Sequence, residues 1–199
     1  MKSMYIGSSD TPSLLAKKSS KSYGNLLRRF VSDQKPYYNA KASPIDALRT
    51  GAILEDRYGL ILPDDYYSQY KCTSNDINVL RSSIDFAKLY KGSILDFDEL
   101  KTCQFDDYLN IQDADIEYIK KNYRNNYLQI QQQLLCSGLD RANLVFLAVY
   151  SYEDEINEVR NIKENEFVKI RISQDAEVID RIIERAKIFQ QIKSDYENR

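Results

Sequence analysis

The chain has 199 residues, of which 43% are hydrophobic and 29% are charged, and its formal net charge is −2. This length and composition are those of one globular domain with a substantial core, and they exclude the disordered and fibrous classes. The sequence has no histidine, which excludes histidine bases, Ser-His triads and histidine-ligated zinc. Any chemistry must come from carboxylate, lysine, tyrosine or cysteine side chains, and carboxylate-rich sites suit Mg²⁺ or Mn²⁺.

The cysteines, the apolar runs and the charge distribution further restrict the class of protein to which the chain can belong. Cys72, Cys103 and Cys136 are widely separated and odd in number, so we expect reduced thiols rather than a disulfide framework. The longest apolar run, residues 144–150, is far too short to span a bilayer, which predicts a cytoplasmic protein without a membrane partner. The first 57 residues carry ten Lys or Arg against five Asp or Glu. This suits a basic groove, and ordinary surface scatter is the alternative.

The N-terminal segment predicts short elements. The first ten residues indicate a short strand or loop and then a helix start, with Ser9 or Asp10 as the N-cap ahead of Pro12. Residues 12–32 predict two short helical pieces, and residues 35–43 predict a loop.

Residues 45–58 predict a helix that carries a carboxylate. Its apolar stripe is expected to consist of Ala47, Leu48, Ala52 and Leu54. Glu55 lies close to this stripe by its spacing from Leu48 and Ala52. A carboxylate on an apolar face is unfavourable unless it is paired or metal-bound, and a plain charge on the helix surface is the alternative.

Three strands are predicted next, and two of them form a hairpin. The strands cover residues 77–80, 84–90 and 94–101. Asp85 stands near the start of the first hairpin arm and Glu99 near the end of the second. Hairpin arms return the chain to its starting level, so both carboxylates reach the same end of the sheet. Two carboxylates brought together repel each other unless a cation lies between them.

The end of this hairpin also carries a lysine. In the stretch FDELKT, Glu99 and Lys101 are two residues apart and therefore share one face of the strand. One interpretation is a metal site with an activating lysine. The alternative is a surface ion pair, worth about 0.5 kcal/mol or nothing.

The rest of the chain predicts a long helix and three further elements. Residues 115–137 form the helix, which ends at Gly138, with Gln129 and Gln133 four apart on one flank. The later elements are a buried strand, a hairpin and a terminal amphipathic helix, over residues 144–150, 158–163 with 166–172, and 174–197.

This order of motifs resembles the PD-(D/E)XK nuclease superfamily, and within it the phage lambda-exonuclease and YqaJ-type viral recombinase family. The stretches that carry the resemblance are IGSSDTPSLL (6–15), ALRTGAILEDRYG (47–59), SSIDF (82–86), DELKT (98–102) and YLQIQQQLLCSG (127–138). The likeness covers about residues 5–150. The family usually has Pro before and Gly after its first metal-binding aspartate, whereas Asp85 lies between Ile84 and Phe86. Asp76 is therefore an alternative to Asp85.

The resemblance implies both a fold and a function. The fold would be a single α/β (α+β) domain over residues 1–199, with a central mixed β-sheet flanked by helices in a restriction-endonuclease-like nuclease core, and a C-terminal hairpin and helix over 151–199. The function would be that of a metal-dependent exonuclease that hydrolyses linear double-stranded DNA, 5′-to-3′, for phage-type recombination by single-strand annealing. Its partners would be double-stranded DNA, a single-strand annealing protein and further copies of the chain in a ring such as a trimer, in the host cytoplasm if the chain is phage-encoded. The alternatives are an endonuclease or repair nuclease of the same superfamily, and a catalytically inactive DNA-binding module.

The resemblance also implies a metal site. Asp85 and Glu99, with the Leu100 carbonyl, would hold one Mg²⁺ or Mn²⁺ ion, and Glu55 would bind a second ion or a water molecule of the first. Metal ions suit this reaction because phosphodiester hydrolysis requires charge screening, a nucleophile and a stabilised leaving oxygen.

Further roles follow from the same resemblance. Lys101 would orient or help to deprotonate the attacking water, and Gln129 would position that water or Lys101. Ser9 would contact a terminal phosphate, and Arg28 and Arg49 would grip the DNA backbone. The alternatives are that Gln129 is ordinary helix polarity and that Ser9 only caps a helix.

Overall fold

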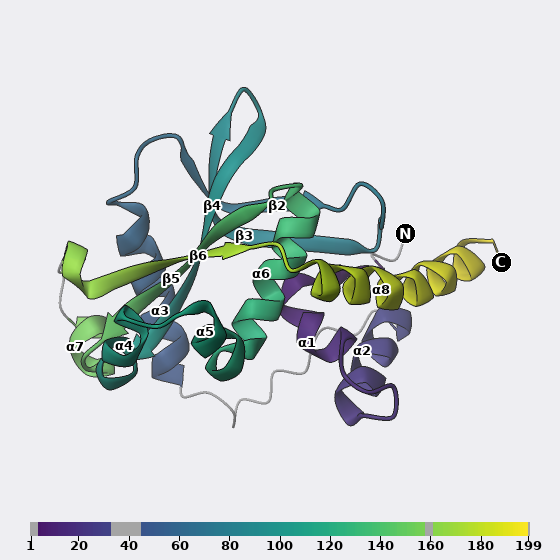
Figure 1. The fold of residues 1–199 in the computed structure, drawn as a ribbon, viewed down its shortest axis with the longest axis horizontal. Coiled ribbons are helices and arrows are strands. Elements are labelled where there is room, and N and C mark those ends of the chain that lie inside the picture. The colour runs from purple at the N-terminus through teal and green to yellow at the C-terminus, as the bar shows by residue number, and fades with distance from the viewer. Residues whose placement is uncertain (1–3, 33–44, 158–160, 199) are drawn as a thin grey trace.

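The computed structural model describes residues 4–32, 45–157 and 161–198, and one mixed β-sheet runs through its centre (Figure 1). The strands are β1 (Ile6–Gly7), β2 (Tyr66–Thr73), β3 (Leu80–Tyr90), β4 (Ser93–Gln104), β5 (Arg141–Val149) and β6 (Phe167–Ser173). Their order is β1-β3-β4-β5-β6, and β2 pairs with β3 outside this path. The β1–β3 and β4–β5 pairs are parallel and the other three pairs are antiparallel. The predicted mixed sheet is confirmed.

Strands β3 and β4 form the predicted hairpin and then separate. Phe86 pairs with Asp98, which brings Asp85 level with Glu99, and the ladder between the two strands ends at that pair. Strand β4 continues alongside β5, while the start of β3 pairs with β1. The resulting fork leaves backbone groups that side chains must satisfy.

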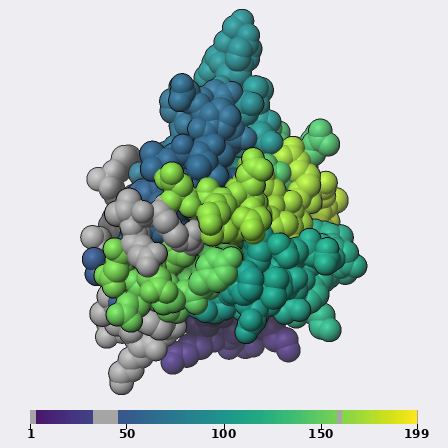
Figure 2. All heavy atoms as spheres, turned by 90° about the vertical axis from the view of Figure 1, so that its left-hand side faces the viewer, coloured from purple at the N-terminus to yellow at the C-terminus, as the bar shows by residue number. Residues whose placement is uncertain are grey.

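Helices cover both faces of the sheet. One face carries the large apolar core, to which six helices contribute: α1 (Thr11–Leu14), α2 (Lys21–Ser32), α4 (Phe105–Gln112), α5 (Ile116–Asn122), α6 (Arg124–Ser137) and α8 (Ala176–Glu197). The other face carries a smaller core under α3 (Ile45–Gly59), which packs against α7 (Tyr152–Asn157). Two 3₁₀ turns, η1 (Ser8–Asp10) and η2 (Glu164–Glu166), precede α1 and β6. The tip of the β3–β4 hairpin stands clear of α3 at the top of the molecule (Figure 2).

The terminal helix α8 buries the stripe that its sequence predicts. Ile179, Ile182, Ala186 and Phe189 are buried, and the Phe189 ring packs edge-on against Phe30 of α2. The stripe therefore belongs to the core of the chain. No helix in the described ranges is both long enough and apolar enough to cross a membrane.

Two predicted strands are wrong. Residues 77–79 form a turn before β3 rather than a strand; Ile77 and Val79 are apolar because this turn packs into the core. The Ser74 hydroxyl accepts a hydrogen bond from the Ile77 N–H and so holds the turn. The predicted C-terminal hairpin also fails, because β6 pairs with β5 and residues 161–163 form no strand. Residues 158–160 of its first arm lie outside the described residues, as does the predicted loop at 35–43.

The long predicted helix is two helices. It breaks at Tyr123, whose backbone leaves the helical region (φ −118°, ψ 36°) and whose ring packs against Phe146. The helices α4 and α7, the turn η2 and the edge strand β2 were not predicted from the sequence. Strand β2 buries only Tyr66, Tyr70 and Cys72, each in part, so its alternation of apolar residues is a weak signal of a strand.

Candidate active site

Glu99 lies at the centre of the fork, with only 1% of the residue exposed. Its Oε1 accepts hydrogen bonds from Lys101 Nζ at 2.6 Å and from Gln129 Nε2 at 2.5 Å. Its Oε2 accepts one from Gln133 Nε2 at 2.5 Å. Donors thus bind both oxygens and fix the direction in which the carboxylate points.

Asp85 fills the gap where the β3–β4 ladder ends. Its Oδ2 accepts a hydrogen bond from the Leu100 N–H at 2.8 Å, which replaces a missing backbone partner. Burial and the neighbouring charge of Glu99 raise the pKa of Asp85 to about 8. In the absence of a cation, this carboxyl group is therefore mostly protonated at neutral pH, and a bound cation would favour its charged form.

Asp76, the alternative to Asp85, lies elsewhere. It belongs to the turn before β3 and lines a cavity beside α8 with Ile77 and Lys187. The register of the hairpin brings Asp85 level with Glu99. The geometry therefore favours Asp85 as the partner of Glu99.

Lys101 forms more than a surface ion pair. Its side chain is 25% exposed, whereas that of its partner Glu99 is 1% exposed. Burial alone would lower the pKa of the Lys101 ammonium group, but the charges of Glu99 and Asp85 outweigh it and raise this pKa. Lys101 is therefore a charged ammonium held beside the Glu99 carboxylate and the Asp85 carboxyl group.

Glu55 reaches the site from the rim of α3, not from the predicted apolar stripe. Leu48 is 65% exposed, and the buried side of the helix carries Leu54 and Tyr58. The helix turns this way because the Tyr58 hydroxyl donates a hydrogen bond to the buried Asp98. Glu55 faces the edge of the sheet, and its charge contributes to the raised pKa of Asp85.

Gln69 of β2 links Glu55 to the fork. Gln69 Nε2 donates to Glu55 Oε1 at 2.5 Å, and Gln69 Oε1 accepts from the Ser83 hydroxyl at 3.1 Å. Gln69 stands opposite Asp85 in the β2–β3 register, and its backbone has a φ of 52°. A positive φ is uncommon for a residue other than glycine and concentrates at functional sites.

The carboxylates of the site suit a hard cation whose coordination shell is completed by the substrate. No group of three His, Cys, Asp or Glu side chains in the described ranges has the geometry of a metal site. The pair of carboxylates, Asp85 and Glu99, comes together at the fork, and Glu55 is engaged by Gln69. Proteins commonly hold Mg²⁺ with one or two carboxylates, while water and substrate phosphates supply the remaining oxygens.

Solved structures share this architecture. The alkaline exonuclease LHK-Exo from Laribacter hongkongensis is 16% identical with a TM-score of 0.63, and the match covers 99% of this chain and 92% of that chain. Its complex with dAMP also gives a TM-score of 0.63, at 17% identity. A phage-related exonuclease from Haemophilus somnus 129PT is 14% identical, with a TM-score of 0.60 and 96% of each chain covered. The chain has the fold of these solved structures. No protein-family model and no curated protein matches its sequence.

This shared fold agrees with the resemblance that the motifs predicted. The match extends over almost the whole chain, so the C-terminal quarter, which the motifs left unassigned, is part of the same fold. Strand β6 of this C-terminal quarter contacts the site region directly. Its Lys169 Nζ lies 2.7 Å from Asp98 Oδ2, and Asp98 is the residue before Glu99.

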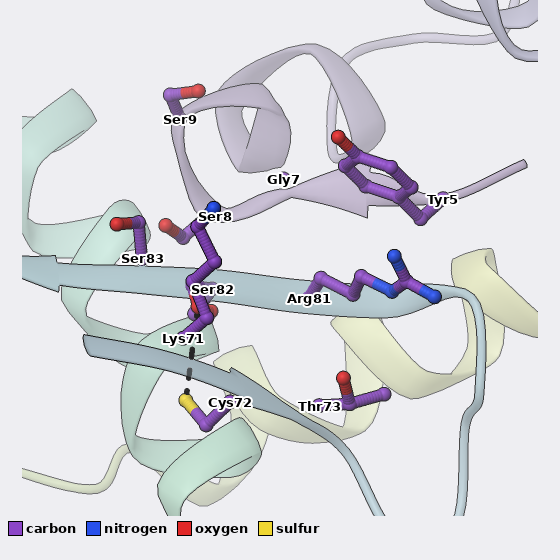
Figure 3. A pocket seen from close by; sticks show the side chains of 10 residues that line it. All are labelled: Tyr5, Gly7, Ser8, Ser9, Lys71, Cys72, Thr73, Arg81, Ser82 and Ser83. Atoms are coloured by element: carbon purple, nitrogen blue, oxygen red, sulfur yellow. Dashed lines mark hydrogen bonds between the residues drawn. The ribbon is translucent and has the colours of Figure 1, made fainter. Parts of the chain in front are cut away.

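Ser9 lies at the edge of a pocket beside β1 (Figure 3). The alternative of a helix cap is wrong, because neither η1 nor α1 has a side-chain cap hydrogen bond. Ser9 is exposed, and it lines the pocket with Ser83, whose hydroxyl bonds to Gln69. The pocket therefore adjoins the candidate active site.

The two predicted phosphate-binding arginines lie outside this pocket. Arg28 is on α2, where its guanidinium bonds to Asn25 Oδ1 at 2.6 Å. Arg49 is exposed on α3. The cations that line the pocket are Lys71 and Arg81, which sequence reasoning missed because a lysine in β2 and an arginine at the start of β3 belong to no motif.

Sequence reasoning also missed Gln133 and Gln69 as parts of the site. For Gln133 a signal exists, because its spacing of four from Gln129 places both side chains on one flank of α6. For Gln69 the sequence holds no such signal, since its position depends on the pairing of β2 with β3 and on a positive φ.

Proposed function

We propose that the protein is a metal-dependent DNA exonuclease that hydrolyses linear double-stranded DNA in the 5′-to-3′ direction. The observation that carries this proposal is the meeting of Asp85, Glu99 and Lys101 at the fork between β3 and β4. The exonuclease fold supports it, since the matched proteins are described as an alkaline exonuclease and a phage-related exonuclease.

The carboxylates of Asp85 and Glu99, with the Leu100 carbonyl, would hold one Mg²⁺ or Mn²⁺ ion, and Glu55 would hold a second ion or a water molecule. When bound, the metal neutralises phosphate charge and makes water more acidic. Gln129 and Gln133 keep Glu99 in one orientation. Such hydrogen bonds around ligands commonly set metal affinity.

Lys101 is the group that would manage the attacking water. Its ammonium lies within hydrogen-bonding distance of Glu99, at 2.6 Å. From there it would orient the water toward the phosphorus and stabilise negative charge as it develops. Gln129 donates a hydrogen bond to the same Glu99 oxygen, so it would keep Lys101 and the carboxylate in a fixed relative position.

The DNA end would enter beside β1. Ser9 would contact the terminal phosphate, while Arg28 and Arg49 would contact the backbone outside the pocket. We further propose that the exonuclease works in phage-type recombination with a single-strand annealing protein, and that copies of the chain assemble into a ring.

The decisive experiment is digestion of linear duplex DNA with one labelled end, in Mg²⁺, beside a covalently closed circle. The parent protein is expected to shorten the linear DNA stepwise from the 5′ end and to leave the circle intact. Lys101→Ala is expected to abolish digestion. Lys88→Ala is the matched control, because Lys88 lies on the same hairpin and forms only a surface ion pair, with Asp65. Its activity should equal that of the parent.

Three results would contradict the proposal. Cutting of the circle would indicate an endonuclease. Full activity in Lys101→Ala would remove the lysine from the mechanism. Intact DNA in both Mg²⁺ and Mn²⁺ would indicate a catalytically inactive DNA-binding module.

A further inference from the structure

Helix α6 carries three consecutive glutamines, Gln131, Gln132 and Gln133, and all three are fully buried. Gln133 bonds to Glu99, whereas Gln132 bonds to the N-terminal segment of the chain. We propose that Gln132 is a positioning residue that fixes Ser9 relative to Glu99. It would thereby set where a terminal phosphate is held with respect to the metal site. The inference rests on the proposed function, in which Ser9 contacts that phosphate.

The amide nitrogen of Gln132 joins strands β1 and β3. It donates hydrogen bonds to the Ile6 carbonyl and to the Arg81 carbonyl, each at 3.1 Å. Strand β1 has only two residues, so its ladder with β3 is the shortest of the sheet. Buried carbonyl groups require donors. Gln132 therefore adds side-chain hydrogen bonds at the place where backbone pairing is shortest.

The amide oxygen of Gln132 contacts the start of helix α1. Gln132 Oε1 lies 2.9 Å from the Thr11 hydroxyl, which also lies 2.7 Å from the Ser8 carbonyl. The hydroxyl has one hydrogen and can donate it to either of these two oxygens. Thr11 is fully buried, so water competes little for the bond. Gln132 thus uses both its nitrogen and its oxygen on one short segment of the chain.

These contacts hold both ends of the segment that carries Ser9. The segment consists of β1, the turn η1 and the first residue of α1. Gln132 bonds to Ile6 at its beginning and contacts Thr11 at its end, and Ser9 lies between them with its side chain exposed. Figure 3 shows Ser9 on the turn that follows β1. With both ends attached to α6, the segment keeps Ser9 at a fixed distance from that helix.

The same helix holds the Glu99 carboxylate. Gln129 and Gln133 donate hydrogen bonds to its two oxygens. Residues three and four apart are neighbours on a helix surface, so Gln129 lies beside both Gln132 and Gln133. Helix α6 thus determines the distance between Ser9 and Glu99. This distance matters because a displacement of about 1 Å can lower the rate of a reaction about 100-fold.

The test measures the affinity for a duplex with a 5′-phosphate end and for the same duplex with a 5′-hydroxyl end, with Ca²⁺ replacing Mg²⁺ to suppress cleavage. The parent protein is expected to bind the phosphorylated end about tenfold more tightly, as one hydrogen bond to a charged group would give. Gln132→Met keeps the approximate shape of the side chain and removes its hydrogen bonds. It should lose most of this preference, with little change in the affinity for the hydroxyl end.

Gln131→Met is the matched control. Gln131 is the preceding residue and is equally buried, but its amide bonds to the Ser173 carbonyl and the Asp175 N–H, between β6 and α8. The substitution should lower the free energy of unfolding to a similar extent and keep the parental preference for the phosphate. A general loss of stability therefore cannot produce the difference between the two variants.

Thr11→Val is a second variant, for the case in which Gln132→Met does not fold. It keeps the size of the side chain and removes the hydroxyl that Gln132 contacts. It should lower the phosphate preference in part, because the bonds from Gln132 to Ile6 and Arg81 remain. Thr11→Ser keeps the hydroxyl and should show the parental preference.

The outcomes distinguish this inference from the proposed function. The positioning role would be overturned by an undiminished phosphate preference in Gln132→Met, or in Thr11→Val where Gln132→Met does not fold. An equal loss of preference in Gln131→Met would overturn it too, as would a parent protein without any preference. A loss confined to Gln132→Met and Thr11→Val would support it. If the same parent protein never cut DNA in Mg²⁺, that result would contradict the exonuclease and leave the positioning role supported.

Discussion

Both oxygens of Glu99 depend on glutamine side chains from a single helix, α6. Gln133 is fully buried, and its amide nitrogen bonds to Glu99 Oε2 and also to the Ser83 carbonyl. It therefore ties the carboxylate of β4 to the backbone of β3, across the fork where the backbone ladder is missing. A leucine of similar size would fill the space but donate nothing.

Gln133→Leu is expected to lower the affinity for Mg²⁺ or Mn²⁺ by about 10- to 100-fold, as for other groups that orient metal ligands. It should also lower the free energy of unfolding by about 1–3 kcal/mol, because a buried oxygen loses its donor. Isothermal titration calorimetry and urea unfolding measure the two effects. Gln191→Leu, on the exposed part of α8, is the control. If Gln133→Leu bound the metal as tightly as the parent does, the prediction would be contradicted.

The raised pKa of Asp85 predicts a pH dependence of stability in metal-free protein. The pKa is about 8 in the folded chain and about 3.9 in an unfolded one. The folded state therefore holds the extra proton between these values, and the contribution of Asp85 to the free energy of unfolding is present below about pH 4 and lost as the pH rises toward 8.

Asp85→Asn removes this titration. Its midpoint of thermal unfolding should rise relative to that of the parent as the pH goes from 5 to 8, measured in EDTA. Parallel midpoints across this range would contradict the assigned pKa.

At the scale of elements, helix α3 is attached to the sheet by a buried polar group. Asp98 has no exposed surface; its Oδ2 accepts from the Tyr58 hydroxyl and from Lys169, both at 2.7 Å, and its Oδ1 accepts from Asn143 at 2.7 Å. Tyr58 follows Glu55 by three residues, and Asp98 precedes Glu99. The Tyr58–Asp98 hydrogen bond thus sets the position of Glu55 relative to the fork.

Tyr58→Phe is expected to lower the free energy of unfolding by about 1 kcal/mol through the lost hydrogen bond, measured by urea denaturation. Activity should fall more than this loss of stability explains, because Glu55 loses its position. Tyr23→Phe, in a buried tyrosine of α2, is the matched control and should leave activity unchanged. A stability loss without any loss of activity would show that the tether has no bearing on the site.

At the scale of the whole molecule, one sheet separates and joins two apolar cores. The larger core lies under α6 and α8, and the smaller one under α3, yet both rest on β4 and β5. Since each core needs the same strands, neither half has an independent support. The C-terminal β6 and α8 complete the sheet and the larger core, so the motif-bearing region 5–150 is no separate unit.

The chain is therefore expected to unfold in one cooperative step, with coincident transitions by circular dichroism and tyrosine fluorescence. Leu54→Ala in the smaller core and Ile130→Ala in the larger one should each lower the free energy of unfolding by about 2–5 kcal/mol. In each variant the unfolding midpoint should fall equally for both probes. Separate transitions for the two probes would contradict the shared sheet.

The sequence alone determined the hairpin and the arrival of its carboxylates at one end of the sheet. A strand alternates with a period of two, so local information places Glu99 and Lys101 on one face. The exact register needed the structure, because a shift between Lys88 and Leu89 brings Asp85 level with Glu99. Helical periodicity likewise places Gln129 and Gln133 on one flank of α6. These contacts follow from spacing along one segment.

Only the tertiary structure decided where α3 points and what surrounds the pocket. The rotation of α3 depends on Tyr58 reaching Asp98, 40 residues away in the sequence, and the stripe that periodicity predicts cannot include that bond. Tyr5, Lys71 and Arg81 meet because β1 and β2 both pair with β3. Such contacts join segments far apart in the chain, where no local spacing rule applies.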